Sequence, residues 1–121
     1  ILVVDDNVDG AKSLSLLLQL AGHTTSIAYS GPTALERAHS FAPEVVFLDI
    51  GLPGMNGYEV ARRLRAELHG AALTLVALTG WGTDDDRKRA HEAGFDHHLT
   101  KPVDAALVHA LLSDMSAARQ A

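Results

Sequence analysis

Short apolar runs alternate with longer segments of helical period along the whole chain, and this alternation most constrains the fold. The apolar runs are residues 1–4, 23–28, 45–48, 73–78 and 98–99. The segments with apolar residues at three- and four-residue spacing are 8–21, 30–42, 58–68, 83–93 and the stretch that begins at 104. Because the apolar runs are continuous, this order predicts an α/β domain with a parallel sheet covered by helices on both faces.

Capping residues support this division of the chain. Ser30 and Asp104 are suited to begin the second and last helices, and Gly22 to end the first. In the last helix, the pattern predicts that three residues face inward: Leu107, Leu111 and Met115.

Composition excludes several classes of protein. The chain has 121 residues, enough for one domain, and no cysteine, so disulfides and thiolate zinc sites are excluded. The net charge of −5 argues against a nucleic-acid surface. No run is apolar for long enough to span a bilayer and no secretory signal is visible, so we expect a cytoplasmic domain without membrane contact.

Both ends of the sequence look cut. Ile1 already lies in an apolar strand-like run, and residues 116–121 still favour a helix. We therefore expect residues 1–121 to be one domain of a longer chain, whose other parts could include a membrane anchor.

Candidate site residues, most of them polar, follow four of the five predicted strands. Ligands of parallel sheets bind beyond the carboxyl ends of the strands, so these residues are expected to meet at one edge. They are Asp5, Asp6, Asp49, Thr79, Gly80, Lys101 and Pro102.

Each of these residues also has a purely structural explanation. Asp5 and Asp6 could cap a helix, and Lys101 could be a solvated surface charge. Their joint occurrence at strand ends favours a site instead. Clustered carboxylates repel one another and stay ionised only beside a cation, and a set of oxygen ligands favours Mg²⁺ over zinc.

Four motifs resemble the receiver family of response regulators in two-component signalling. Thr79 follows Asp49 by thirty positions and Lys101 follows Thr79 by twenty-two, as in that family. The motifs are residues 3–7, 48–57, 79–80 and 99–102. The resemblance implies a flavodoxin-like (βα)5 doubly wound parallel sheet with strand order 2-1-3-4-5. Residues 77–104 most resemble receivers attached to hybrid sensor histidine kinases.

The resemblance also implies the role of each acidic residue. Asp49 would be the phosphoacceptor, receiving a phosphoryl group from phosphohistidine. Asp6, Asp49 and the backbone carbonyl of Gly51 would bind Mg²⁺, and Asp5 would act mostly through a water bound to the metal. The domain would be a signalling switch that catalyses its own phosphorylation, without an external substrate.

The remaining motif residues would contact the phosphoryl group or change conformation in response to it. The Thr79 hydroxyl, the Gly80 N–H and Lys101 would contact the phosphoryl oxygens, and Thr79 would act with His98 as the conformational switch. The resemblance also implies a cis bond between Lys101 and Pro102.

Partners follow from the same resemblance. A histidine kinase or histidine phosphotransfer domain would dock on the first helix, where Leu16 and Leu20 extend the apolar stripe. The fourth helix, fifth strand and last helix would form the output face. Either this face or the first helix could support a weak dimer.

Three positions depart from common members of the family. His98 stands where many receivers carry Tyr or Phe, which predicts weaker switch coupling that weakens further as the pH falls. Gly51 and Trp81 offer no side chain to orient an attacking water, which predicts a long-lived phosphoryl group and a relay role.

Other functions remain open on sequence grounds. An aspartate-nucleophile phosphatase would need a second acid where Gly51 stands, and a flavodoxin-like cofactor binder would need a phosphate loop in place of the acidic Asp5–Asn7 run. A receiver-like interaction module without productive phosphorylation is a third alternative. A metal site formed by His91, His97 and His98 lacks the required pattern.

Overall fold

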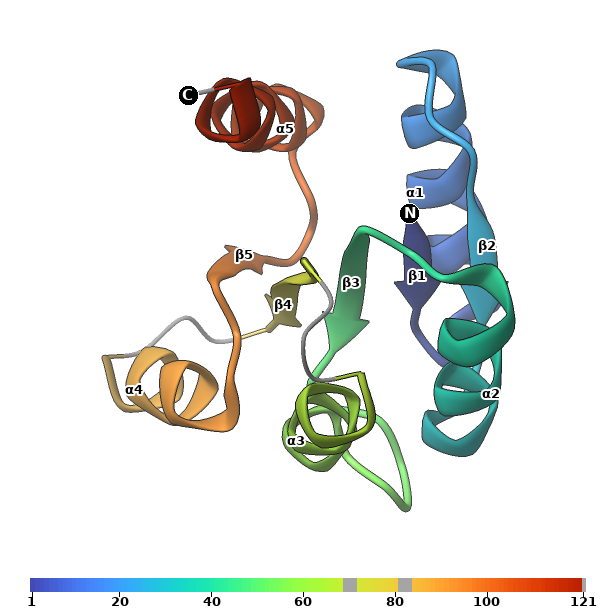
Figure 1. Ribbon diagram of the computed structural model, residues 1–121, viewed down its shortest axis with the longest axis vertical. Coiled ribbons are helices and arrows are strands. Elements are labelled where there is room, and N and C mark those ends of the chain that lie inside the picture. Colours follow the sequence, from blue (N-terminus) through green and yellow to red (C-terminus); the bar gives the residue numbers. More distant parts are fainter. Residues whose placement is uncertain (69–71, 81–83, 121) are drawn as a thin grey trace.

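The computed structural model describes residues 1–68, 72–80 and 84–120. Strands and helices alternate from end to end, as the periodicity predicts (Figure 1). The strands are β1 (Leu2–Val4), β2 (Ser26–Ala28), β3 (Val45–Asp49), β4 (Thr74–Thr79) and β5 (His97–Thr100). The helices are α1 (Val8–Leu20), α2 (Gly31–Phe41), α3 (Gly57–Glu67), α4 (Asp84–Ala93) and α5 (Ala105–Gln120).

The five strands form one parallel sheet in the order β2-β1-β3-β4-β5. Helices α1 and α5 lie on one face, and α2, α3 and α4 lie on the other (Figure 1). The predicted fold class and strand order are therefore confirmed.

The core is divided by the sheet into two clusters. Along β3, Val46 and Leu48 face the cluster with α2, α3 and α4, whereas Val45 and Phe47 face the cluster with α1 and α5. All four side chains are buried. Because β3 and β4 are covered on both faces, their carboxyl ends are held at a fixed edge of the domain. None of the helices described is both long and apolar enough to cross a membrane.

The predicted capping residues lie at the helix ends. The Ser30 hydroxyl accepts a hydrogen bond from the Thr33 N–H at 3.3 Å, and the Asp104 carboxylate accepts one from the Ala106 N–H at 2.7 Å. Gly22 follows α1 with φ at +96°, a conformation that glycine adopts without a steric penalty.

The prediction for the inward face of α5 is wrong at one position. Leu107 is 56% exposed, while its neighbour Val108 is fully buried. Residues 107, 111 and 115 are spaced by four, so they drift around a helix with 3.6 residues per turn. The row that faces the core runs instead through Val108, Leu111 and Met115.

Gly57, the first residue of α3, packs directly on the end of β3. A Cβ atom at this position would lie 2.4 Å from the Ile50 Cα and 2.5 Å from the Asp49 carbonyl oxygen. We expect Gly57→Ala to lower the free energy of unfolding by about 2 kcal/mol, because overpacking against backbone cannot be relieved by a rotamer change. Urea denaturation measures this change.

Gly10→Ala is the matched control, because the nearest atom to an added Cβ in α1 is the Asn7 Cγ at 3.5 Å. This substitution should leave stability unchanged or raise it, since alanine favours helix. Equal effects of the two substitutions would contradict the close approach at Gly57.

Candidate functional site

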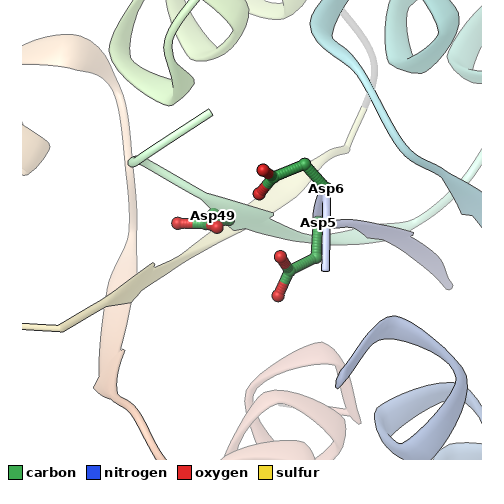
Figure 2. Close-up of side chains that lie close together, drawn as sticks. All are labelled: Asp5, Asp6 and Asp49. Carbon is green, nitrogen blue, oxygen red and sulfur yellow. The ribbon is translucent and has the colours of Figure 1, made fainter. Parts of the chain in front are cut away.

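Three carboxylates meet at the carboxyl edge of the sheet, as predicted. Asp5 and Asp6 follow β1 directly, and Asp49 is the last residue of β3. One carboxylate oxygen from each lies within 4.8 Å of the others. Figure 2 shows the three side chains extending from neighbouring strand ends.

The three acids differ in their access to solvent. Asp5 and Asp49 are buried, with 4% and 8% of their surfaces exposed, whereas Asp6 is exposed. A ligand therefore reaches the cluster from the side of Asp6, while Asp5 and Asp49 form its inner wall.

Lys101 joins the two buried carboxylates. Its ammonium group donates to Oδ2 of Asp5 at 2.9 Å and to Oδ2 of Asp49 at 3.1 Å. The other oxygens accept backbone hydrogen bonds, Oδ1 of Asp5 from the Asn7 N–H at 3.0 Å and Oδ1 of Asp49 from the Gly51 N–H at 2.8 Å. Both carboxylates are thus held in fixed orientations by β-strand ends and loop backbone.

Burial and charge act against each other at this site. Burial raises the pKa of Asp49, although the Gly51 N–H and Lys101 partly oppose the rise, and the nearby Asp5 adds to it. For Lys101, burial lowers the pKa, but hydrogen bonds to Asp5 and Asp49 outweigh it and the net pKa is raised. The ammonium group therefore stays charged at neutral pH.

The loop after β5 aims Lys101 at the acids. The Lys101–Pro102 peptide bond is cis, in agreement with the expectation. The Lys101 N–H donates to the Thr79 carbonyl oxygen at 2.7 Å, which ties the loop to the end of β4. Thr79 is buried there, and Gly80 is exposed with open space where a side chain would stand.

Gly51 is exposed beside Asp49 and has room for a side chain. An added Cβ would meet only Oδ1 of Asp49, at 3.4 Å. The residue that would shield the other side, Trp81, lies outside the described residues. The long lifetime expected for a phosphoryl group stays a prediction.

His98 lies in β5 and pairs with Ala77 of the neighbouring strand β4. Thr79 stands two residues after Ala77 in β4 and pairs with Thr100. His98 is half-buried and lines a small hollow with Arg87 and His91 of α4. Burial, Arg87 and His97 lower the pKa of His98, so its imidazole is neutral at pH 7. The weak, acid-sensitive coupling expected of His98 stays a prediction.

The residues present fit a hard divalent cation. Three carboxylates face one ammonium group, which leaves two negative charges for an ion to balance. All the donors are oxygen atoms, which suits Mg²⁺. Burial raises the pKa of Asp49, and the nearby Asp5 adds to the rise, so a bound cation would favour the ionised form of this carboxylate.

Two features of this region were missed by the sequence analysis. The N-cap of α1 is Asn7, whose Oδ1 accepts from the Gly10 N–H at 3.0 Å, so the alternative capping role for Asp5 and Asp6 is wrong. The direct contact between Lys101 and Asp5 was not predicted. The predicted convergence of acids and a lysine at one sheet edge was the signal from which this contact could have been predicted.

An arginine clamp was missed as well. Arg65 in α3 donates to the Gly94 and Leu73 carbonyl oxygens and to the Asp96 carboxylate, the last at 2.6 Å. These bonds fasten α3 to the loop between α4 and β5 and to the start of β4. Nothing in the local sequence distinguishes this arginine from its neighbours.

The parallel sheet and its acidic edge define an α/β domain with a carboxylate site suited to a divalent cation, and comparison with known proteins gives its family. The chain belongs to the response regulator receiver domains, whose sequence model matches residues 1–113. Receiver domains act as switches in two-component systems and interact with histidine kinases or phosphotransfer proteins.

Similar proteins agree with this assignment. The chain is 33% identical over 116 residues to the response regulator PleD of Caulobacter vibrioides, covering 96% of this chain and 26% of PleD. It is 37% identical over 102 residues to the DNA-binding response regulator MtrA of Mycobacterium tuberculosis, covering 84% of this chain and 43% of MtrA. The receiver domain of NtrX from Brucella abortus superposes with a TM-score of 0.84 at 29% identity, covering 93% of this chain and 94% of that one.

We expect Asp49→Asn to stabilise the metal-free domain at neutral pH. The folded-state pKa of Asp49 is raised above 3.8, so its ionised form is disfavoured by folding. The gain should be full above the folded-state pKa and vanish as the pH falls below the unfolded value, where both states are protonated. Urea denaturation of parent and variant across that pH range measures it. A gain that persists in acid would show that charge is not its cause.

Proposed function

We propose that this domain takes a phosphoryl group from phosphohistidine onto Asp49. The observation that carries the proposal is the meeting of Asp5, Asp6 and Asp49 beside Lys101. The most buried acids of the site are held by backbone N–H groups and Lys101, so the acceptor carboxylate is oriented before the donor arrives.

Asp6, Asp49 and the backbone carbonyl of Gly51 would hold Mg²⁺, with Asp5 acting through a bound water. The ion would neutralise charge on the transferring phosphoryl group. The Gly51 backbone already contacts Asp49 through its N–H, which supports its place beside the ion.

Phosphoryl transfer requires little proton chemistry from the protein. A carboxylate oxygen of Asp49 attacks phosphorus, the bond between phosphorus and the donor imidazole nitrogen breaks, and the nitrogen keeps the electron pair. Asp49 needs no general base, because a carboxylate is its own nucleophile. Charge on the phosphoryl oxygens would be met by Lys101, the Thr79 hydroxyl and the Gly80 N–H.

The first test is covalent labelling. Incubation with acetyl phosphate and Mg²⁺ should add one phosphoryl group, measured by intact-protein mass spectrometry, and Asp49→Asn should abolish it. Chelation of divalent ions should prevent labelling of the parent, because the cluster then lacks its counter-charge.

Asp9→Asn is the control, since Asp9 is an exposed acid of the first turn of α1 outside the cluster. Labelling of Asp49→Asn at the parent level would overturn the assignment of the acceptor. Absence of labelling in the parent would favour the alternative of an interaction module without phosphorylation.

We further propose that the donor docks on α1. Leu16 and Leu20 are 56% and 81% exposed, and Val8 in the first turn of α1 is 44% exposed. Helix α1 begins beside the acidic edge, so a histidine phosphotransfer domain or kinase that covers its exposed side would bring its phosphohistidine to Asp49.

Substitutions on α1 should therefore separate two donors. Leu16→Glu and Leu20→Glu should slow transfer from a phosphohistidine protein at least about tenfold and leave labelling by acetyl phosphate unchanged. Leu107→Glu on α5 is the control, because Leu107 has the same 56% exposure as Leu16. Equal slowing with both donors, or by the control, would contradict docking on α1.

The setting of the domain is also proposed. The chain spans about a quarter of PleD and less than half of MtrA, which supports residues 1–121 as one domain of a longer protein. We propose a cytoplasmic phosphorelay role with output through α4, β5 and α5, without nucleic-acid or membrane contact by this domain. Attachment to a hybrid histidine kinase and weak dimerisation through α1 or the output face remain proposals.

A further inference from the structure

A small hollow between α3 and α4 is lined by two arginine side chains. Its volume is about 160 Å³. It is lined by Asn56, Tyr58, Arg62, Arg89, Glu92 and Ala93. The hollow combines side chains from two helices, so its shape depends on the packing of α3 against α4.

Arg62 and Arg89, which line the hollow, differ from the nearby arginines Arg63 and Arg65, which each form an ion pair. Arg63 contacts Glu59 at 3.6 Å, and Arg65 contacts Asp96 at 2.6 Å. In the part of the chain that the structure describes, neither Arg62 nor Arg89 lies within 4.0 Å of a carboxylate oxygen. Two guanidinium groups from different helices therefore border one hollow with their charges uncompensated by close ion pairs.

Tyr58 orients one of these arginines. The Arg89 guanidinium carbon lies 4.8 Å from the centre of the Tyr58 ring, a cation–π distance. Tyr58 is half-buried against the core, so its ring is a fixed platform. At the same rim, Asn56 uses Oδ1 to cap the Glu59 N–H at 3.0 Å, which leaves its amide NH₂ as a donor.

Acidic groups near the hollow limit which anions can bind. Glu92 lines it, and Asp86 lies close enough to Tyr58 to act on the pKa of its hydroxyl. These carboxylates repel any anion, so a ligand must make strong contacts with both arginines to bind. A tetrahedral dianion offers several acceptor oxygens to the two guanidinium groups, whereas a carboxylate offers only two.

We propose that this hollow is a binding site for a phosphate dianion, either inorganic phosphate or a phosphomonoester. A small tetrahedral oxyanion suits the volume, and its oxygens can accept from Arg62, Arg89 and the Asn56 amide. The site is distinct from the proposed phosphoacceptor site, because its lining includes none of Asp5, Asp6, Asp49, Thr79 or Lys101.

The test is an amide NMR titration of the metal-free domain with inorganic phosphate at constant ionic strength, which removes general screening. We expect saturable shifts at residues 56–58 and 89–93, weakened at least about tenfold by Arg62→Gln or Arg89→Gln. Glu92→Gln should strengthen binding. Affinity should fall as the pH drops through the second pKa of the ligand, which is about 6 for a phosphoserine side chain and higher for inorganic phosphate, because the second negative charge is then lost.

Arg63→Gln is the matched control, and Tyr58→Phe should bind normally while Tyr58→Ala does not, since only the ring is needed. A neutral tripeptide with a central phosphoserine distinguishes a partner's phosphorylated side chain from free phosphate. Binding of either ligand supports the site, and acetate should fail. No saturable shifts with either phosphate, or equal weakening by Arg63→Gln, would overturn the proposal without touching the acceptor role of Asp49.

Discussion

The double contact of Lys101 with Asp5 and Asp49 is the interaction on which the functional edge depends. Burying two carboxylates side by side is unfavourable unless a positive charge lies between them. Lys101 provides that charge, and its own position requires the loop after β5 to turn back toward β4. The hydrogen bond from its backbone N–H to Thr79 fixes this turn. The geometry of three strand ends is thus coupled through one side chain.

This coupling explains how a sheet edge can remain ready for a cation. Lys101 compensates part of the negative charge and leaves the exposed Asp6 on the open side. A fully neutralised cluster would have little affinity for a divalent ion, whereas an uncompensated one would hold protons instead. One ammonium group against three carboxylates places this site between the two limits. The same balance makes the environment of Asp49 sensitive to any change in the position of Lys101.

The sequence predicted the fold because each local signal agrees with the global arrangement. Apolar runs such as Val45–Leu48 can only be buried strands, and the polar residues after them must then share an edge. The sequence-based predictions failed where the outcome depends on the rotation of a helix about its axis or on a contact between residues far apart in the sequence. Leu107 and Val108 are equally apolar, and only the phase of α5 selects Val108. Arg65 and Asp96 are thirty-one positions apart, so no local sequence pattern predicts their contact.

Strand β5 and the residue that follows it carry two basic groups whose pKa values are shifted in opposite directions. Directly after the strand, contacts with two acids raise the pKa of Lys101 and keep its charge constant near neutrality. Three residues earlier, burial, Arg87 and His97 lower the pKa of His98, so its imidazole is neutral at pH 7. Mild acid therefore protonates His98, whereas Lys101 is already charged and does not change. The charge that orients Asp49 and the side chain that responds to pH beside α4 therefore lie only three residues apart.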